Sequence, residues 1–207
     1  MKVLIINGSP HERGTTATAL AELERTLAAE KIECETVHIG NKQVTGCVGC
    51  GACHKGHVGC IHDSIVNEVA EKFREADGII VGSPVYYASP NGTLIAFLDK
   101  LFYSSQFDKS MKVGAAVVCA RRGGCTASFD VINKYFSISS MPIATSCYWN
   151  QVHGAVAEDA PLDEEGMMTM RTLAKNMAFL IKSIALGKEK FGLPEKEPKT
   201  RTNFIRR

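Results

Sequence analysis

The feature that most constrains the fold is the alternation of short apolar runs with segments whose apolar residues recur at helical spacing. The runs at 2–7, 78–82 and 113–119 are apolar almost throughout, as is typical of parallel strands covered on both faces. Crossovers between such strands are right-handed, so this order predicts an α/β fold: a doubly wound five-stranded parallel sheet in a three-layer sandwich. The other strands are expected at 33–39 and 143–148, and helices from 15 onward and over 64–76, 94–102, 129–136 and 170–184. Asp63 stands just before the helix at 64–76 as its candidate N-cap.

Length and composition favour one globular domain with a tail. The 207 residues suit a single α/β domain, and the apolar and charged fractions of 45% and 22% are ordinary for a globular protein. After Gly187 the composition shifts to Lys, Glu and Pro. We therefore expect a domain over 1–187 and an arm outside the core over 188–207.

Charge and hydropathy argue against two classes of partner. The formal net charge is only +2 and the basic excess lies at the C-terminal end, so no nucleic-acid-binding surface is expected. No apolar run reaches the length of a membrane span, and the opening run ends at Asn7 without the pattern of a signal peptide. We expect a cytoplasmic protein that binds neither nucleic acid nor membrane.

The loop after the first predicted strand has the composition of a phosphate site. It reads GSPHERGTT over 8–16, and the unpaired N–H groups at the start of the following helix suit an anion. Neither the dinucleotide fingerprint Gly-x-Gly-x-x-Gly nor the Gly-Lys-Ser/Thr of a P-loop is present. The alternative is a polar turn that only caps the helix. The candidate phosphate-binding residues are Ser9, His11, Arg13, Thr15 and Thr16.

Four of the eight cysteines lie together in a glycine-rich segment, and they are Cys47, Cys50, Cys53 and Cys60. In a reducing compartment a disulfide framework is not expected. Thiolates at this spacing can close around a [4Fe–4S] cubane, and two successive gaps of two residues are more typical of iron-sulfur than of zinc. Zinc remains open, with His54 and His57 in the same loop, and so do free thiols.

Taken together, three segments resemble a known family. They are GSP at 8–10 with GTT at 14–16, the cysteine cluster, and GSPVYY at 82–87. They resemble the NAD(P)H-dependent FMN reductase branch of the flavodoxin-like superfamily, and within it most closely the iron-sulfur flavoproteins, over about residues 1–186. His11 stands where the family often has Arg, and Thr15 where Asn is common, but both keep a donor. The resemblance implies a flavodoxin-like fold that binds FMN, with the phosphate in the first loop.

The resemblance also assigns two loops to the flavin ring. It implies that the loop after the third strand wraps the dimethylbenzene and ribityl side, because a large flat ring needs a flat apolar wall. It implies that the loop after the fourth strand faces the pyrimidine edge, where Arg121 or Arg122 could stabilise negative charge near N1 or steer the NADPH phosphate. Plain surface roles remain open for the tyrosines and the arginines. The residues concerned are Pro84, Val85, Tyr86, Tyr87, Ala120, Arg121, Arg122, Gly123 and Gly124.

The resemblance therefore implies an FMN-dependent oxidoreductase that passes electrons from NAD(P)H, or from ferredoxin, to a quinone, a flavin or an iron-sulfur protein. The cofactor carries the chemistry, so no side chain need act as a catalytic acid or base. The cysteine motif matches that of iron-sulfur flavoproteins, which would make the chain a one-electron relay, although many FMN reductase relatives keep a similar loop without a cluster. The alternatives from another class are a flavodoxin-like electron carrier and a thiol redox sensor.

The resemblance further implies a homodimer or homotetramer with the flavins near the interface. His153, Trp149 and Tyr148, after the last predicted strand, could cover the flavin of a partner subunit or simply pack the interface.

Overall fold

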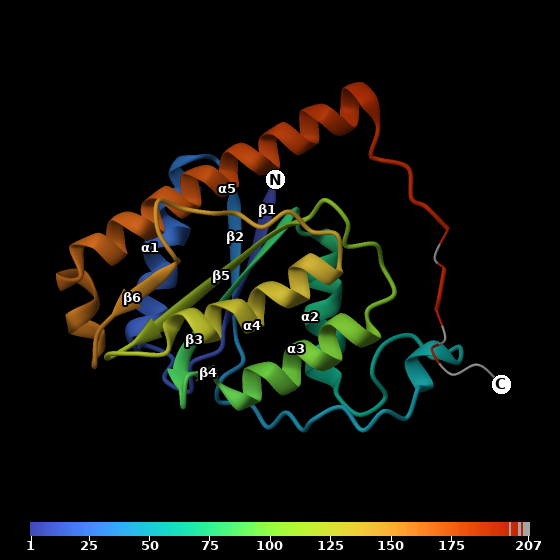
Figure 1. The fold of residues 1–207 in the computed structure, drawn as a ribbon, viewed down its shortest axis with the longest axis horizontal. Helices are drawn as coiled ribbons and strands as arrows, with labels where there is room; N and C mark the ends of the chain where they lie inside the picture. Colours follow the sequence, from blue (N-terminus) through green and yellow to red (C-terminus); the bar gives the residue numbers. More distant parts are fainter. Residues whose placement is uncertain (199, 203, 205–207) are drawn as a thin grey trace.

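The computed structural model describes residues 1–198, 200–202 and 204, and its centre is a sheet of six strands between two layers of helices (Figure 1). Five strands lie in the order β2-β1-β3-β5-β6, and every neighbouring pair among them is parallel. This order is the one expected of a doubly wound, flavodoxin-like sheet. The strands are β1 (Lys2–Asn7), β2 (Glu33–His38), β3 (Gly78–Tyr86), β4 (Ser89–Pro90), β5 (Val113–Ala120) and β6 (Gln151–His153).

The prediction of five strands was wrong, because the sheet has a sixth strand, β4. β4 has two residues and runs antiparallel to the end of β3, with Pro90 opposite Val85. Two residues form no periodic pattern, so the sequence carried no signal for this strand.

The predicted last strand, 143–148, was also wrong. Within it only Ile143 makes an isolated bridge to β5, and the sheet is completed instead by Gln151–His153. The apolar run is interrupted at Ser146, whose hydroxyl donates to the Tyr148 carbonyl at 2.6 Å. A side chain that bonds to the nearby backbone in this way folds the chain locally and competes with strand pairing.

Helices cover both faces of the sheet, with α1 and α5 on one face and α2, α3 and α4 on the other. In β1, Val3 and Ile5 point into one hydrophobic cluster and Leu4 and Ile6 into the other, because side chains alternate along a strand. The helices are α1 (Thr15–Ala29), α2 (Ser64–Glu75), α3 (Gly92–Ser104), α4 (Cys125–Ile138) and α5 (Glu164–Phe191), with short 3-10 turns η1 (Ala52–His54) and η2 (Ala157–Leu162).

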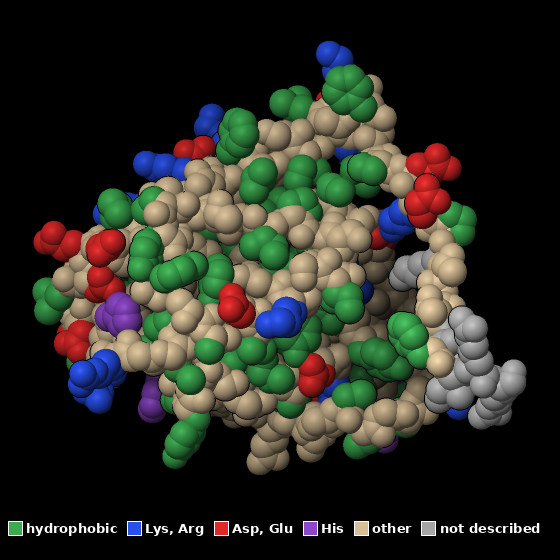
Figure 2. Space-filling view, viewed as in Figure 1, with side chains coloured by type: hydrophobic (Ala, Val, Ile, Leu, Met, Phe, Trp, Pro, Cys, Tyr) green, Lys and Arg blue, Asp and Glu red, His purple; other side chains and the backbone are tan. Residues whose placement is uncertain are grey.

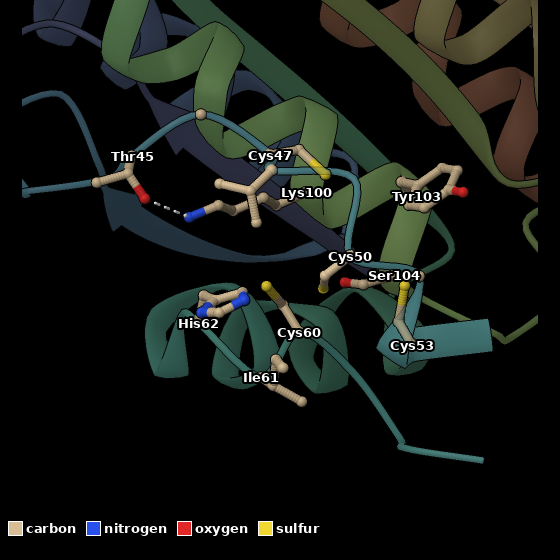
Figure 3. A pocket seen from close by; sticks show the side chains of 13 residues that line it. Thr45, Cys47, Cys50, Cys53, Cys60, Ile61, His62, Lys100, Tyr103 and Ser104 are labelled. Carbon is tan, nitrogen blue, oxygen red and sulfur yellow. Dashed lines mark hydrogen bonds between the residues drawn. The ribbon is translucent and has the colours of Figure 1, made fainter. Parts of the chain in front are cut away.

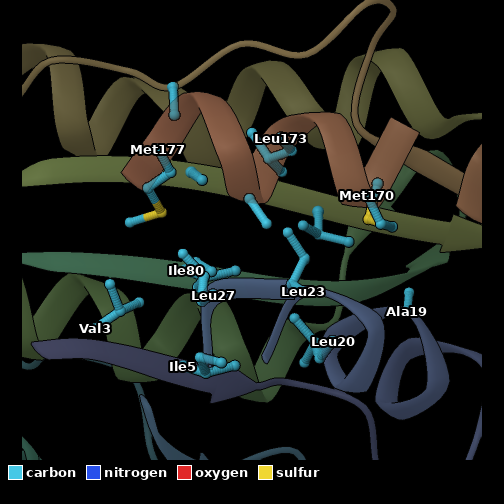
Figure 4. Packing of buried hydrophobic residues seen from close by; sticks show 14 of the residues in the cluster. Val3, Ile5, Ala19, Leu20, Leu23, Leu27, Ile80, Met170, Leu173 and Met177 are labelled. Carbon is cyan, nitrogen blue, oxygen red and sulfur yellow. The ribbon is translucent and has the colours of Figure 1, made fainter. Parts of the chain in front are cut away.

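The apolar stripes that predicted α1 and α5 meet over the sheet (Figure 4). Each fully buried Leu, Ile or Met stabilises the fold by about 1.5–3 kcal/mol relative to an exposed one. This packing fixes the start of α1 at the end of β1, where the predicted phosphate loop lies. The buried residues of the two helices include Leu20, Leu23, Leu27, Met170, Leu173 and Met177.

The C-terminal part leaves the core after α5, which runs to Phe191 and ends at Gly192 with a positive φ of 75°. Lys196 then pairs with Asp108 at 2.6 Å, and this contact together with hydrogen bonds from Ser110 lowers the pKa of Asp108 to about 2. The predicted arm, 188–207, falls only in part within the described residues, since 199, 203 and 205–207 lie outside them. None of the described helices combines the length and apolarity needed to cross a membrane.

Candidate functional site

The carboxyl ends of the strands bring the three predicted cofactor-binding loops to one edge of the sheet. The loop after β1 is tied to β3 by the Gly8 N–H, which donates to the Gly82 carbonyl at 2.8 Å. β1 and β3 are neighbours, and the chain leaves them towards β2 on one side and β5 on the other. Such a topological switch point is where doubly wound sheets bind their ligands.

At this point α1 begins without a side-chain cap. Its N-cap residue is Gly14, no side chain among the described residues accepts from the first N–H groups, and the first turn carries no acidic residue. These N–H groups are left for another acceptor, and the positive end of the helix dipole favours an anion. His11 and Arg13, in the loop that leads into the helix, are exposed. The arrangement is suited to bind a phosphate.

The phosphate loop is shaped by contacts to its own backbone. The Ser9 hydroxyl accepts from the His11 N–H at 3.1 Å, and the Ser9 N–H donates to the Asn7 side chain at 3.0 Å. From β2, the Nε2 atom of His38 lies 2.6 Å from the Ser9 carbonyl oxygen. A Cβ on Gly40 would lie 2.1 Å from the same oxygen, so the chain after β2 fits against the loop only without a side chain.

The two threonines at the start of α1 are already engaged within the protein. The Thr15 hydroxyl donates to the Val156 carbonyl at 3.0 Å and ties α1 to the loop after β6. Thr16 is buried beside the Cys119 thiol, whose pKa is raised by burial to about 12. Sequence reasoning missed Val156, because a carbonyl contact across 141 positions leaves no local pattern.

The loop after β3 is a tight hairpin that carries the two predicted tyrosines. At its tip Tyr87 and Ala88 both have positive φ, 51° and 55°. Two such values match a type I′ turn, which suits the twist of paired strands but is uncommon for residues with a side chain. Tyr86 is 44% exposed and Tyr87 fully exposed, so both rings are open to solvent, while Pro84 and Val85 are half-buried.

The loop after β5 lies directly against this hairpin. A Cβ on Gly124 would come within 2.9 Å of atoms of Val85 and Ala88, and Gly124 itself has a φ of 95°. Gly124 is the N-cap residue of α4, a second helix start without a side-chain cap. Ala120 ends β5, and its carbonyl accepts a hydrogen bond from the Gly154 N–H, which follows β6, at 3.1 Å. Next to Gly124, Gly123 is exposed and its backbone is open to a ligand.

Two cations project from the same loop. Arg121 and Arg122 are exposed, and within the part of the chain that the structure describes neither guanidinium makes an ion pair. Their charge is therefore free to act on an anionic ligand at this edge of the sheet.

The four clustered cysteines line one cavity of about 210 Å³ in the connection between β2 and α2 (Figure 3). Cys47 and Cys50 are exposed and Cys53 and Cys60 half-buried, and all four are free thiols. The chain turns back on itself repeatedly around the cavity, at glycines with positive φ. These are Gly49, Gly51, Gly56 and Gly59. The other wall comes from α3, which contributes Lys100, Tyr103 and Ser104.

A buried ion pair ties the cysteine loop to the helices. The Lys100 side chain is 2% exposed, and its ammonium group lies 3.1 Å from both the Asp63 carboxylate and the Thr45 hydroxyl. The other Asp63 oxygen accepts from the Val66 N–H at 3.2 Å, which confirms the predicted N-cap of α2. One carboxylate thus fixes the end of the cysteine loop to both α2 and α3.

Ser104 lines the same cavity, and its buried hydroxyl has no hydrogen-bond partner in the described structure. A buried polar group left unpaired costs about 1–3 kcal/mol of stability, so a ligand with a hydrogen-bond acceptor would be stabilised at this position. Sequence reasoning missed both Lys100 and Ser104. The signal that could have found them is their position, since they are polar residues one turn apart within the apolar stripe of α3.

This set of groups fits a thiolate-bound iron-sulfur cluster. Soft thiolates are the ligands that such clusters use, and hydrogen-bond donors around the sulfur atoms are part of their sites. Within residues 1–198, 200–202 and 204, no three His, Cys, Asp or Glu side chains converge closely enough to hold a single metal ion. A cubane makes a different demand, because each thiolate binds a different iron and the four sulfurs surround a volume.

Known proteins resemble the chain in both sequence and fold. The family model described as NADPH-dependent FMN reductase matches residues 1–155. An iron-sulfur flavoprotein of Methanocaldococcus jannaschii is 34% identical over 193 residues, which span 89% of this chain and 99% of that protein. A flavodoxin from the domain Archaea has a TM-score of 0.60 at 15% identity, over 88% of this chain and 99% of that one. RosB, solved with bound 8-demethyl-8-formylriboflavin-5'-phosphate, has a TM-score of 0.68 at 16% identity, over 100% and 94%. The two structural likenesses show that the fold is flavodoxin-like.

Proposed function

The chain belongs to the NADPH-dependent FMN reductase family of flavin-dependent oxidoreductases, and from this premise we propose its cofactors and its electron path. The protein binds FMN and passes electrons from NAD(P)H, or from ferredoxin, to a quinone, a flavin or an iron-sulfur protein. The observation that carries the proposal is the uncapped start of α1 at the switch point of the sheet. It offers an anion site beside two loops that are suited to a flat ring.

The residues that would hold FMN come from the three loops. The N–H groups of the first turn of α1 bind the phosphate, with charge from His11 or Arg13. The exposed rings of Tyr86 and Tyr87 supply the flat apolar surface that an isoalloxazine needs. Gly123 lets the backbone approach the pyrimidine edge closely.

Exposed cations next to that edge support an anionic ligand. The guanidinium groups of Arg121 and Arg122 stabilise negative charge on the ring or steer the phosphate of NADPH. FMN, when bound, supplies the chemistry by taking a hydride and releasing electrons one or two at a time. The chain binds and orients the cofactor, and NAD(P)H and the acceptor use the same open face in turn.

A second cofactor is proposed on the cysteine loop, a [4Fe–4S] cluster held by Cys47, Cys50, Cys53 and Cys60. Three observations support it: the cavity that these thiols share, the unpaired hydroxyl of Ser104 beside them, and the name iron-sulfur flavoprotein carried by a relative that spans most of the chain. A cluster there supplies one-electron transfer to or from FMN. Without it the same loop is a set of free thiols on a flavin reductase.

Both cofactors are tested on protein purified without oxygen. An absorption spectrum with iron and sulfide assays should show flavin bands and about four irons per chain. The Cys50→Ser variant should lose iron and keep FMN, whereas Cys147→Ser, which replaces an exposed thiol outside the loop, should keep both.

Activity is tested on the same preparation, by following NADH and NADPH oxidation with and without an added quinone and reduction by ferredoxin. Protein that binds no FMN, or that takes electrons from none of these donors, contradicts the proposed function. FMN without iron contradicts the cluster alone and leaves a flavin reductase.

We also propose that the chain forms a homodimer or homotetramer. Large apolar side chains stand exposed on α5 and on the loop before β6, among them Phe179 at 70%, Leu186 at 67% and Trp149 at 50%. Figure 2 shows hydrophobic side chains gathered over α4 and α5. Large apolar side chains left exposed near one another are typical of an interface between subunits.

A further inference from the structure

One side of the cysteine cavity is polar and comes from a single helix. Lys100 and Ser104 are one turn apart on α3, and each is only 3% exposed. Residues at this spacing lie on the same helical face, so both side chains reach the cavity that the four thiols line (Figure 3). α3 also contributes Tyr103 to the lining, but only Lys100 and Ser104 among these three residues are buried.

The Ser104 hydroxyl is a donor without an acceptor. Its neighbour Ser105 behaves as a serine in a helix commonly does and donates to the Leu101 carbonyl at 2.6 Å. Ser104 makes no such bond, although it is more deeply buried. In Figure 3 its oxygen and the sulfurs of Cys50 and Cys53 face the same cavity.

Lys100 has donor capacity to spare. An ammonium group carries three N–H donors, and the described contacts use two of them, to Asp63 and to Thr45. Asp63 balances its charge but does not line the cavity, whereas Lys100 does. The Lys100 side chain thus runs along the cavity, and its ammonium group lies at the Thr45 end (Figure 3).

We propose that Ser104 donates a hydrogen bond to a sulfur atom of the [4Fe–4S] cluster, and that this bond and the nearby charge of Lys100 raise the reduction potential of the cluster. This inference rests on the proposed cluster. When the cluster takes up one electron its negative charge grows, and hydrogen bonds to its sulfurs together with a nearby cation stabilise that reduced state. The two residues are tuning residues: they bind no iron and leave the number of ligands unchanged.

Ser104→Ala is the sharper test, because the hydroxyl holds nothing else in place. The variant should keep its iron, and the metal-free form should be at least as stable to heat as the wild type, since an unpaired buried group has been removed. A redox titration followed by EPR should show about a tenfold lower ratio of reduced to oxidised cluster at a fixed potential. This corresponds to a midpoint potential lowered by about 59 mV for one electron. Ser105→Ala, the same change one residue further on, should leave the potential where it is.

Lys100→Met should also lower the reduction potential of the cluster. Because this variant breaks the ion pair with Asp63, its potential is compared with that of the wild type in protein with full iron content. A Ser104→Ala protein with full iron and the potential of the wild type overturns the inference and leaves the proposed cluster standing. Wild-type protein without iron overturns both, so the two failures are distinguishable.

Discussion

Replacing Gly40 by Ala tests whether the close fit between the chain after β2 and the loop after β1 shapes the phosphate site. In this fit a Cβ on Gly40 would lie 2.1 Å from the Ser9 carbonyl oxygen and 2.4 Å from the Gly8 carbonyl oxygen. Both are backbone atoms, which cannot turn aside as the end of a side chain can. Ordinary contact begins at 3.4 Å, so the loop must move away by about 1 Å.

The size of the effect follows from that displacement. Overpacking of this kind costs about 1–3 kcal/mol of stability, and each kcal/mol lowers Tm by about 2–4 °C in a chain of this length. Ser9 leads into the N–H groups that we propose for the FMN phosphate, so their positions shift with it. Loss of one hydrogen bond to a charged group costs about 1.5–3 kcal/mol, and we therefore expect the Kd of FMN to rise about 10- to 100-fold.

The assay is a titration of flavin-free protein with FMN, followed by flavin fluorescence, together with a thermal unfolding curve. Gly92→Ala is the matched control, because a Cβ at this first residue of α3 meets no atom within 4 Å and should change neither quantity. If Gly40→Ala binds FMN within about twofold of the wild type and melts at the same temperature, the reasoning about this close contact is refuted.

Two further predictions concern α1 and α5. Burial disfavours the charged form of Glu22, but hydrogen bonds from Arg25 and Arg171 outweigh it and lower its pKa below the ordinary 4.5. The stabilising effect of the Glu22 carboxylate is therefore present above pH 4.5 and is lost as the pH falls through the lowered pKa. In urea unfolding, Glu22→Gln should cost about 1 kcal/mol of stability at pH 7 and much less at pH 3. A difference that does not change with pH would contradict this. Phe179→Lys places a charge on the exposed apolar surface of α5 and should reduce the mass measured by sedimentation to that of a monomer; an unchanged mass argues against that interface.

The elements that the sequence predicted correctly are those whose signal is local. The start of α2 was predicted from Asp63 as its N-cap, and the strands at the centre of the sheet from apolar runs such as 113–119, because each of these depends on neighbours in the chain. The strand predicted at 143–148 failed, since the Ser146 hydroxyl bonds locally and the Asn150 side chain donates to the Ala116 carbonyl. Of residues 143–148 only Ala144 is buried, so a short run of this kind does not by itself predict burial or pairing in the sheet.

In the candidate site, too, some features could be predicted from local sequence and others only appear in the tertiary structure. The predicted loops do meet at one edge of the sheet, because parallel strands place the loops that follow them at the same end. The predicted role of the Thr15 hydroxyl has a competitor, the Val156 carbonyl, that only the tertiary structure reveals. Lys100 and Ser104 were missed for a related reason. The role of a polar residue in an apolar stripe depends on the cavity beside it, and that cavity is visible only in the tertiary structure.

The cysteines occupy one excursion of the chain, residues 39–63, whose ends are anchored by β2 and by the Asp63 carboxylate. The entropic cost of closing a loop grows only with the logarithm of its length, so that doubling the length of this segment costs about 0.6 kcal/mol. The part of this segment between Gly40 and Asp63 can therefore change in length or sequence during evolution with little effect on the sheet, whereas Gly40 itself is constrained by the loop after β1. Under the proposed function this segment carries the cluster, so proteins that share the core could exchange electrons with different redox partners by changing this segment alone.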